Sequence, residues 1–211
     1  MAGDEAHTET VTQVALNDES SVSFRQIVAL TFANKRILVA GVLVAVFSFA
    51  SKPIFMYWPQ IVAELKMPEA LRGWTVLAMS IPIMIGSLIA GHTKLIPHNK
   101  RGLSLLLLVL SMGLLLAGLA QNLAVFIAGL AIIEFAYGAM AIVTYGYLYV
   151  EVHSSHRTTV NSMMSATRTL GGAISLLAMG EIADLLSPQA AIAITGGVVL
   201  LVLLYKYVSK D

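Results

Sequence analysis

The stretch ILVAGVLVAVFSFASKPIFMYWPQIV (37–62) decides the fold class, because it is long and largely apolar. Its one charged residue is Lys52. An α-helix needs about 20 mostly apolar residues to cross the hydrocarbon core of a bilayer. Backbone groups in that core must be hydrogen-bonded within their own segment, which a helix achieves. The stretch therefore predicts a membrane-spanning helix that contains Lys52 and Pro53.

The rest of the chain has the same character. Of its 211 residues, 57% are hydrophobic and 12% are charged, whereas soluble domains carry about 25% charged residues. A net charge of +1 argues against a nucleic-acid partner, and no cysteine is present to form a disulfide. Short polar breaks separate six apolar segments, which predict an all-α membrane protein with six transmembrane helices at 37–62, 73–96, 103–120, 123–149, 159–185 and 188–207.

The polar flanks predict the domain boundaries and the orientation. Residues 1–22 are expected to be a disordered acidic cytoplasmic tail, residues 37–207 the six-helix domain, and residues 208–211 the cytoplasmic C-terminus. Residues 23–36 predict an interfacial amphipathic helix, with an extension of the first span as the open alternative. Lys and Arg are concentrated in the breaks on the N-terminal side, and this asymmetry predicts that both termini are cytoplasmic.

The sequence contains a weak internal repeat. A shift of 85 residues superposes the starts of the first three segments on those of the last three, and it matches Gly86 with Gly171 and Arg72 with Arg157. A unit of three spans that occurs twice must lie in opposite orientations, an arrangement found in many secondary transporters. The fold is therefore expected to consist of two inverted three-helix repeats.

Two charged residues stand inside apolar segments, Lys52 in the first and Glu134 in the fourth. Charges inside hydrocarbon are costly and usually mark a substrate or proton pathway. We expect such a pathway here, with Tyr57 and Tyr137 as its walls. A structural ion pair between the two charges and a Lys52 side chain that reaches the membrane surface remain alternatives. Pro53 removes a backbone hydrogen bond and is expected to kink its helix.

Two stretches resemble transporters of the major facilitator superfamily. HRTTVNSMMSATRTLGGAISLLAMGEIADLLSPQAA (156–191) is similar to the family's eleventh helix and the loop after it, with matches that include Arg168, Gly171, Gly172 and Asp184. GSLIAGHTKLIPHNKRG (86–102) is similar to the eighth helix and its basic loop. In that loop Leu95 stands where the family has an acid, and the matching positions are Gly91, Lys100 and Arg101.

The resemblance implies the C-terminal six-helix half of a twelve-helix transporter. Function would then require a second six-helix unit, either another copy of this chain or a separate N-terminal half. The segment with Gly91, Lys100 and Arg101 would act as a cytoplasmic latch loop. Structural roles in packing or at helix ends are expected for Arg168, Gly171, Gly172 and Asp184.

No signature of an enzyme, a cofactor site or a metal site is found. Glu151, His153 and His156 lie close together in the sequence, but their spacing matches no strong zinc motif. The chain has no Gly-x-Ser-x-Gly, His-Glu-x-x-His or Walker sequence. We therefore expect neither catalysis nor direct coupling to ATP.

Together these features predict a secondary active transporter, or half of one, that moves a small molecule by alternating access. Its expected location is the lipid bilayer of the cell (plasma) membrane, and proton coupling through Glu134 is a further hypothesis. The alternative is a non-transporting membrane partner, a regulatory protein or a truncated remnant of a transporter. In that case Lys52 and Glu134 would form a structural bridge.

Overall fold

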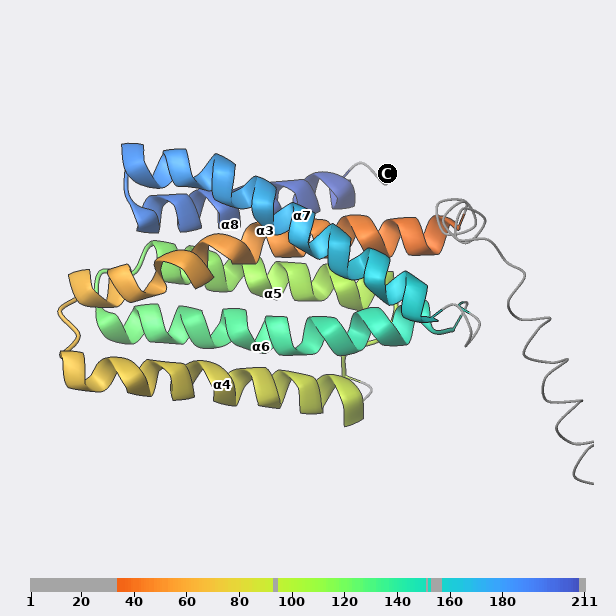
Figure 1. Cartoon of the computed structure of the whole chain (residues 1–211), viewed down its shortest axis with the longest axis horizontal. Coiled ribbons are helices and arrows are strands. Elements are labelled where there is room, and N and C mark those ends of the chain that lie inside the picture. The colour runs from red at the N-terminus through yellow and green to blue at the C-terminus, as the bar shows by residue number, and fades with distance from the viewer. Residues whose placement is uncertain (1–33, 93–94, 151, 153–156, 209–211) are drawn as a thin grey trace, which may run out of the picture.

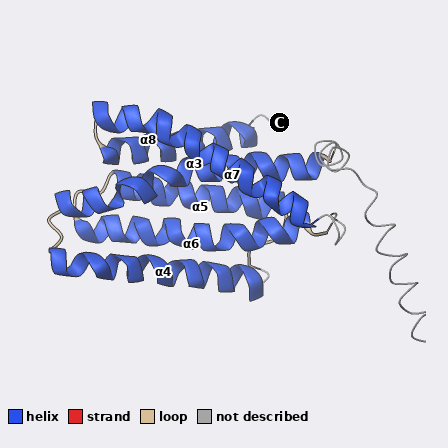
Figure 2. Ribbon diagram, viewed as in Figure 1, coloured by secondary structure: helices blue, strands red, loops and turns tan. Residues whose placement is uncertain are grey.

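The computed structural model of the chain describes residues 34–92, 95–150, 152 and 157–208, drawn in colour in Figure 1. The described part is helical and contains no strand (Figure 2). Its helices are α3 (Lys35–Glu64), α4 (Glu69–His92), α5 (Lys100–Gly118), α6 (Leu123–Leu148), α7 (Arg157–Leu185) and α8 (Pro188–Val208). The predicted tail at 1–22, all but the last residues of the predicted interfacial helix at 23–36, and residues 209–211 lie outside the described residues.

Asparagine side chains fix where three of the helices begin. Asn34, Asn99 and Asn122 each accept a hydrogen bond from a backbone N–H two or three residues later. Such an N-cap satisfies one of the N–H groups that the first helical turn leaves unpaired. For α5, the bond from the Arg101 N–H to Asn99 Oδ1 is 2.9 Å long. The helix therefore begins at Lys100 and not at the predicted residue 103.

Four helices, α3 to α6, are long and apolar enough to cross a membrane. The described apolar part of α8, Pro188–Leu204, is shorter. The 29-residue helix α7 is long enough, but it carries polar residues such as Asn161, Ser165 and Arg168 along its length. The prediction of apolar spans is thus confirmed for four segments, and α7 differs from it because its polar side chains lower its hydropathy.

The helices lie side by side in a bundle, with α4 along one edge and α7 and α8 along the other (Figure 1). The main packing partners are α4 with α6, α6 with α5, α5 with α8, and α3 with α7. Large side chains that are fully buried come mainly from α3, α5 and α6, and they include Ile54, Leu106, Leu110, Phe126 and Ile133. The core therefore lies where these three helices meet.

Small residues let α4 approach α6 closely. A Cβ atom at Gly86 would overlap the backbone carbonyl of Phe135, and Gly138 faces Ile83 in a similarly close contact. Ser87 Oγ donates a hydrogen bond to the Gly138 carbonyl oxygen at 3.0 Å. Small residues and hydroxyl groups are common at contacts between membrane helices, where van der Waals packing replaces the hydrophobic driving force.

Candidate functional site

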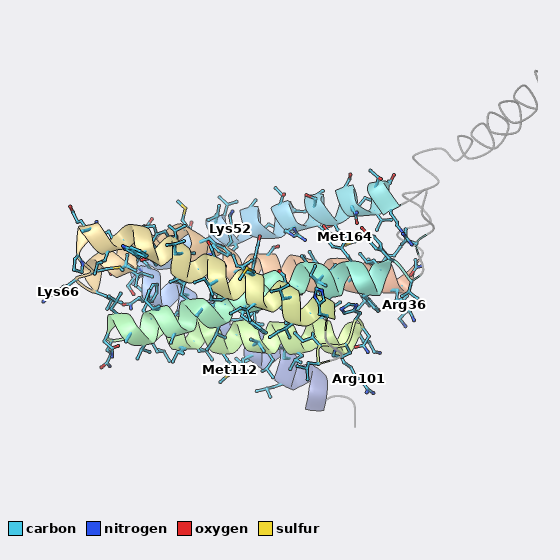
Figure 3. All side chains as sticks on the ribbon, turned by 90° about the horizontal axis from the view of Figure 1, so that it is seen from below. Arg36, Lys52, Lys66, Arg101, Met112 and Met164 are labelled. Carbon is cyan, nitrogen blue, oxygen red and sulfur yellow. The ribbon has the colours of Figure 1, made fainter. Side chains whose placement is uncertain are left out.

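Lys52 lies on an exposed face of α3 and leans on α7. Its Cγ, Cδ and Cε atoms lie 3.5 to 3.8 Å from the position that a Cβ on Gly172 would occupy, so the lysine stem is in van der Waals contact with α7. Figure 3 shows Lys52 on the side of the bundle where α7 lies, away from Met112. The next residue, Pro53, is buried, and α3 continues through it as one helix.

Glu134 is fully buried in α6, with a relative exposure of 0%. Neither of its carboxylate oxygens has a hydrogen-bond partner among the residues that the structure describes. One turn later on α6, Tyr137 contacts α3 and Gly138 contacts α4. An unpaired carboxylate at such a place is costly. It therefore needs a proton, a cation or a polar partner from outside the described residues.

The two charges do not pair with each other. Within the described ranges, the one ion pair between side chains is the surface contact of Arg72 with Glu69 at 3.7 Å, at the start of α4. The structural bridge considered as an alternative above is therefore not formed in this conformation. Lys52 contacts α7, whereas Glu134 is fully buried in α6.

The two predicted wall tyrosines lie on different sides of α3. Tyr137 is 37% exposed, and its ring centroid lies 5.1 Å from that of Phe55 and 6.0 Å from that of Phe47. Tyr57 is half-buried, and its hydroxyl lies 3.9 Å from the position of a Cβ on Gly180 of α7. The structure therefore brings Tyr137 toward α3 and Tyr57 toward α7, and it does not bring the two tyrosines together.

The other residues matched on α7 occupy distinct places. Gly171 packs against α3, where its Cβ would lie 2.6 Å from the Ala45 carbonyl oxygen. Arg168 is half-buried one turn before Gly172, and Asp184 is exposed near the end of the helix. Gly171 thus forms the close part of the contact between α3 and α7, and Gly172 lies at ordinary contact distance from the Lys52 stem.

The predicted latch residues lie at the end of the bundle where α3, α5 and α7 begin, which we call the basic end. Figure 3 shows Arg36 and Arg101 at this end and Lys66 at the other. Gly91, Lys100 and Arg101 are all exposed, and a Cβ at Gly91 would meet nothing within 4 Å. Among the described residues, no side-chain hydrogen bond or ion pair joins these three residues to another helix.

A connection that sequence reasoning missed is made by His98, in the break before α5. Its Nε2 atom hydrogen-bonds the Ala90 carbonyl oxygen of α4 at 2.8 Å, and its ring contacts Gly146 of α6. His98 therefore links the ends of these two helices. The available signal was a histidine placed shortly after a helix C-terminus, where its N–H can reach an unpaired carbonyl.

Arg–Tyr contacts, also missed, tie α6 to the starts of α3 and α7. The Arg157 guanidinium lies 4.8 Å above the Tyr149 ring, and that of Arg36 lies 5.6 Å above the Tyr147 ring. Arginine stacked on tyrosine is a favourable cation–π arrangement. The tyrosines at the end of α6 therefore also serve as contacts between helices.

The described residues contain no group of three or more His, Cys, Asp or Glu side chains that could hold a metal ion. Glu151, His153 and His156 lie outside the described residues. The structure therefore offers no described donor set to which a metal-dependent reaction could be assigned.

A comparison with protein families gives a match to the model described as Major Facilitator Superfamily, over residues 37–211. The matched range contains all of α4 to α8 and α3 from Ile37 onward. No curated protein and no solved structure matches the chain.

Proposed function

Because this chain belongs to the major facilitator superfamily, we propose that it is a secondary active transporter, or half of one, that moves a small molecule by alternating access. It is an integral membrane protein of a transporter family. One observation carries the proposal: Lys52 and Glu134, inside apolar helices, lack a polar partner among the described residues. Charges kept in this state inside a membrane usually serve a substrate, an ion or a proton.

The repeat of three helices supports this mechanism. The 85-residue shift that relates Gly86 to Gly171 also relates their contacts, because one joins α4 to α6 and the other joins α7 to α3. Ser111 Oγ donates a 2.7 Å hydrogen bond to the carbonyl oxygen of Gly196. The 85-residue shift matches Ser111 with Gly196, so these two residues are equivalent in the two repeats. Equivalent residues that touch lie on the axis relating two repeats. This contact supports our proposal that a pseudo-two-fold axis between α5 and α8 relates the two repeats.

We propose that all six helices cross the membrane and that a second six-helix unit faces α4 and α7. In α4 only Thr75, Gly86 and Ala90 are buried within this chain. In α7 an open depression is lined by polar residues that include Ser162, Ser165 and Thr169. A polar helix face is unfavourable against lipid. It is better accommodated against a water-filled cavity or another protein unit.

In this mechanism Glu134 is the proton-binding group, and Lys52 contacts the substrate. Tyr137 and Tyr57 form the apolar walls on the two sides of α3. The Gly91–Arg101 segment acts as the latch at the basic end, and His98 supports it from α4 and α6. The positive charges at that end support a cytoplasmic location for it and for both termini, and we propose the plasma membrane as the location.

Alternating access is tested with single cysteines, because the chain has no cysteine of its own. Val42→Cys and Met56→Cys place thiols on α3 on either side of Lys52, at residues that are 56% and 61% exposed. Met112→Cys is the matched control, since Met112 is 54% exposed on the opposite side of the bundle (Figure 3). A membrane-impermeant maleimide is added to oriented vesicles from either side at a series of pH values.

The proposal predicts that Val42→Cys reacts from the basic end and Met56→Cys from the other. Because Glu134 is the proposed proton-binding group, the labelling rates of these two cysteines should change in opposite directions with pH. Met112→Cys, which faces lipid, should stay unlabelled. Rates that rise and fall together would indicate a continuous channel. Labelling rates that do not change with pH would favour a non-transporting membrane protein.

A further inference from the structure

A groove runs along the seam between α3 and α7, on the basic-end side of Lys52. Its walls include Ile37, Gly41, Val42 and Ala45 of α3 and Met164 and Thr167 of α7, and its volume is about 190 Å³. From Ile37 to Ala45 it follows α3 for about 12 Å at the helical rise. An apolar cavity of about 150 Å³ can hold benzene. The groove is therefore large enough for a slender apolar chain, and its methionines can adapt to one.

The side-chain stem of Lys52 approaches the inner end of this groove, farthest from the basic end. Ala45 lines the groove and packs against Gly171. The neighbouring Gly172 contacts the Lys52 stem as far as Cε, at 3.8 Å from a Cβ position. Because side chains on a helix lean toward its N-terminus, the stem is directed from residue 52 back toward the turn of Ala45. The groove thus leads from the basic end to a cation.

A second cation, Arg168, stands on α7 near the groove. Arg168 follows the groove residue Thr167 directly and stands one turn before Gly172 on α7. Neither Lys52 nor Arg168 forms an ion pair with any carboxylate of the described ranges. Glu134, the acid nearest in depth by sequence, pairs with neither of them. Two cations inside the membrane without a counter-charge call for an anion from outside the chain.

We propose that the groove and Lys52, with Arg168 beside it, form a binding site for an amphipathic carboxylate. The carboxylate is held by Lys52, and the apolar tail lies along the groove toward the basic end. This substrate class rests on the transport function proposed above. Phospholipid head groups stay at the bilayer surface, whereas Lys52 lies inside a span, so a small single-chain carboxylate matches the charge and the volume better.

Binding is measured by calorimetry on the full chain in phosphatidylcholine nanodiscs, with empty nanodiscs subtracted. The probes are octanoate, octan-1-ol, octyltrimethylammonium and acetate. Octanoate should bind at least about tenfold more tightly than the other three, because each lacks either the anion or the tail. Equal binding of octanoate and octan-1-ol would show a simple apolar or lipid site and would overturn the proposal.

Variants assign the site to the groove. Lys52→Gln and Arg168→Gln should each weaken octanoate binding, by about tenfold for Lys52, while Lys52→Arg should retain it. Gly41→Ala should also weaken binding of the tail, because it adds a methyl group to the groove wall, and that Cβ would lie at an ordinary contact distance of 3.6 Å from Met164 Cε. Lys66→Gln, at the far end of the bundle, is the matched control and should have no effect.

Other outcomes overturn the proposal without ambiguity. Unchanged octanoate binding in Lys52→Gln would remove the lysine from the site. If Lys52→Gln leaves binding intact but disrupts association with a second unit, its counter-charge comes from that unit. Flux into proteoliposomes separates the two proposals. Octanoate binding without transport would refute the transport function alone, and transport of other molecules without octanoate binding would refute this site alone.

Discussion

Replacing Glu134 with leucine is expected to make the protein more stable, although it removes a residue that we place in the transport pathway. The carboxylate is fully buried and both of its oxygens lack a hydrogen-bond partner in the described part of the chain. Leucine offers a similar volume without polar atoms. The substitution therefore removes a cost of the native state and loses no described interaction.

The size of the gain follows from the two unsatisfied oxygens. A buried polar group without a partner costs about 1–3 kcal/mol, and apolar replacements of buried charged groups have stabilised other proteins by about 1–4 kcal/mol. We expect Glu134→Leu to raise the free energy of unfolding by about 1–3 kcal/mol. Glu134→Gln should gain less, because its amide would still lack partners.

The assay is reversible unfolding of the purified protein in mixed micelles, followed by circular dichroism. Glu181→Leu is the control, since Glu181 is exposed on α7 and its replacement should change stability by no more than about 0.5 kcal/mol. A loss of several kcal/mol in Glu134→Leu would refute the reasoning. It would mean that Glu134 has a structural partner, and the role in proton binding would lose its basis.

Three further substitutions test the helix contacts. Gly86→Ala should cost about 1–3 kcal/mol, because its Cβ would overlap the Phe135 carbonyl. Gly91→Ala, where nothing lies within 4 Å, should be neutral or stabilising by up to about 1 kcal/mol in the same unfolding assay; equal effects of the two would contradict the close contact. Ser111→Ala should cost about 1 kcal/mol through loss of the bond to Gly196, and an unchanged stability would remove that bond from the account. His98→Ala should speed amide hydrogen exchange at the ends of α4 and α6, and unchanged exchange would show that His98 does not hold them.

The helices themselves could be predicted from the sequence with little ambiguity. Long apolar runs need helices in lipid, and Asn, Pro and charged residues mark the breaks between them. The start of α5 is harder to predict, because its N-cap, Asn99, lies within the polar break IPHNKRG (96–102) that separates two apolar segments. The polarity of α7 is harder to predict, since its Ser, Thr and Asn residues, which lie mainly in its first half, alternate with apolar ones.

The arrangement of the two charges could not be predicted in the same way. Their presence inside spans is plain from the sequence, but the direction in which each one points is not. In a helix that is apolar on all sides, hydrophobic periodicity does not show which face meets which neighbour. The stem of Lys52 contacts Gly172, which lies on a different helix. Contacts of this kind depend on the packing of helices far apart in the sequence.

The central claim is that this six-helix bundle works against a second six-helix unit, and the mass of the protein tests it most directly. The protein is purified in nanodiscs from cells that also express its native neighbouring genes, and its mass is measured by native mass spectrometry. The account predicts a homodimer or a stable complex with another six-helix chain. A stable monomer of 22.5 kDa, with α4 and α7 covered by lipid alone, would contradict the account.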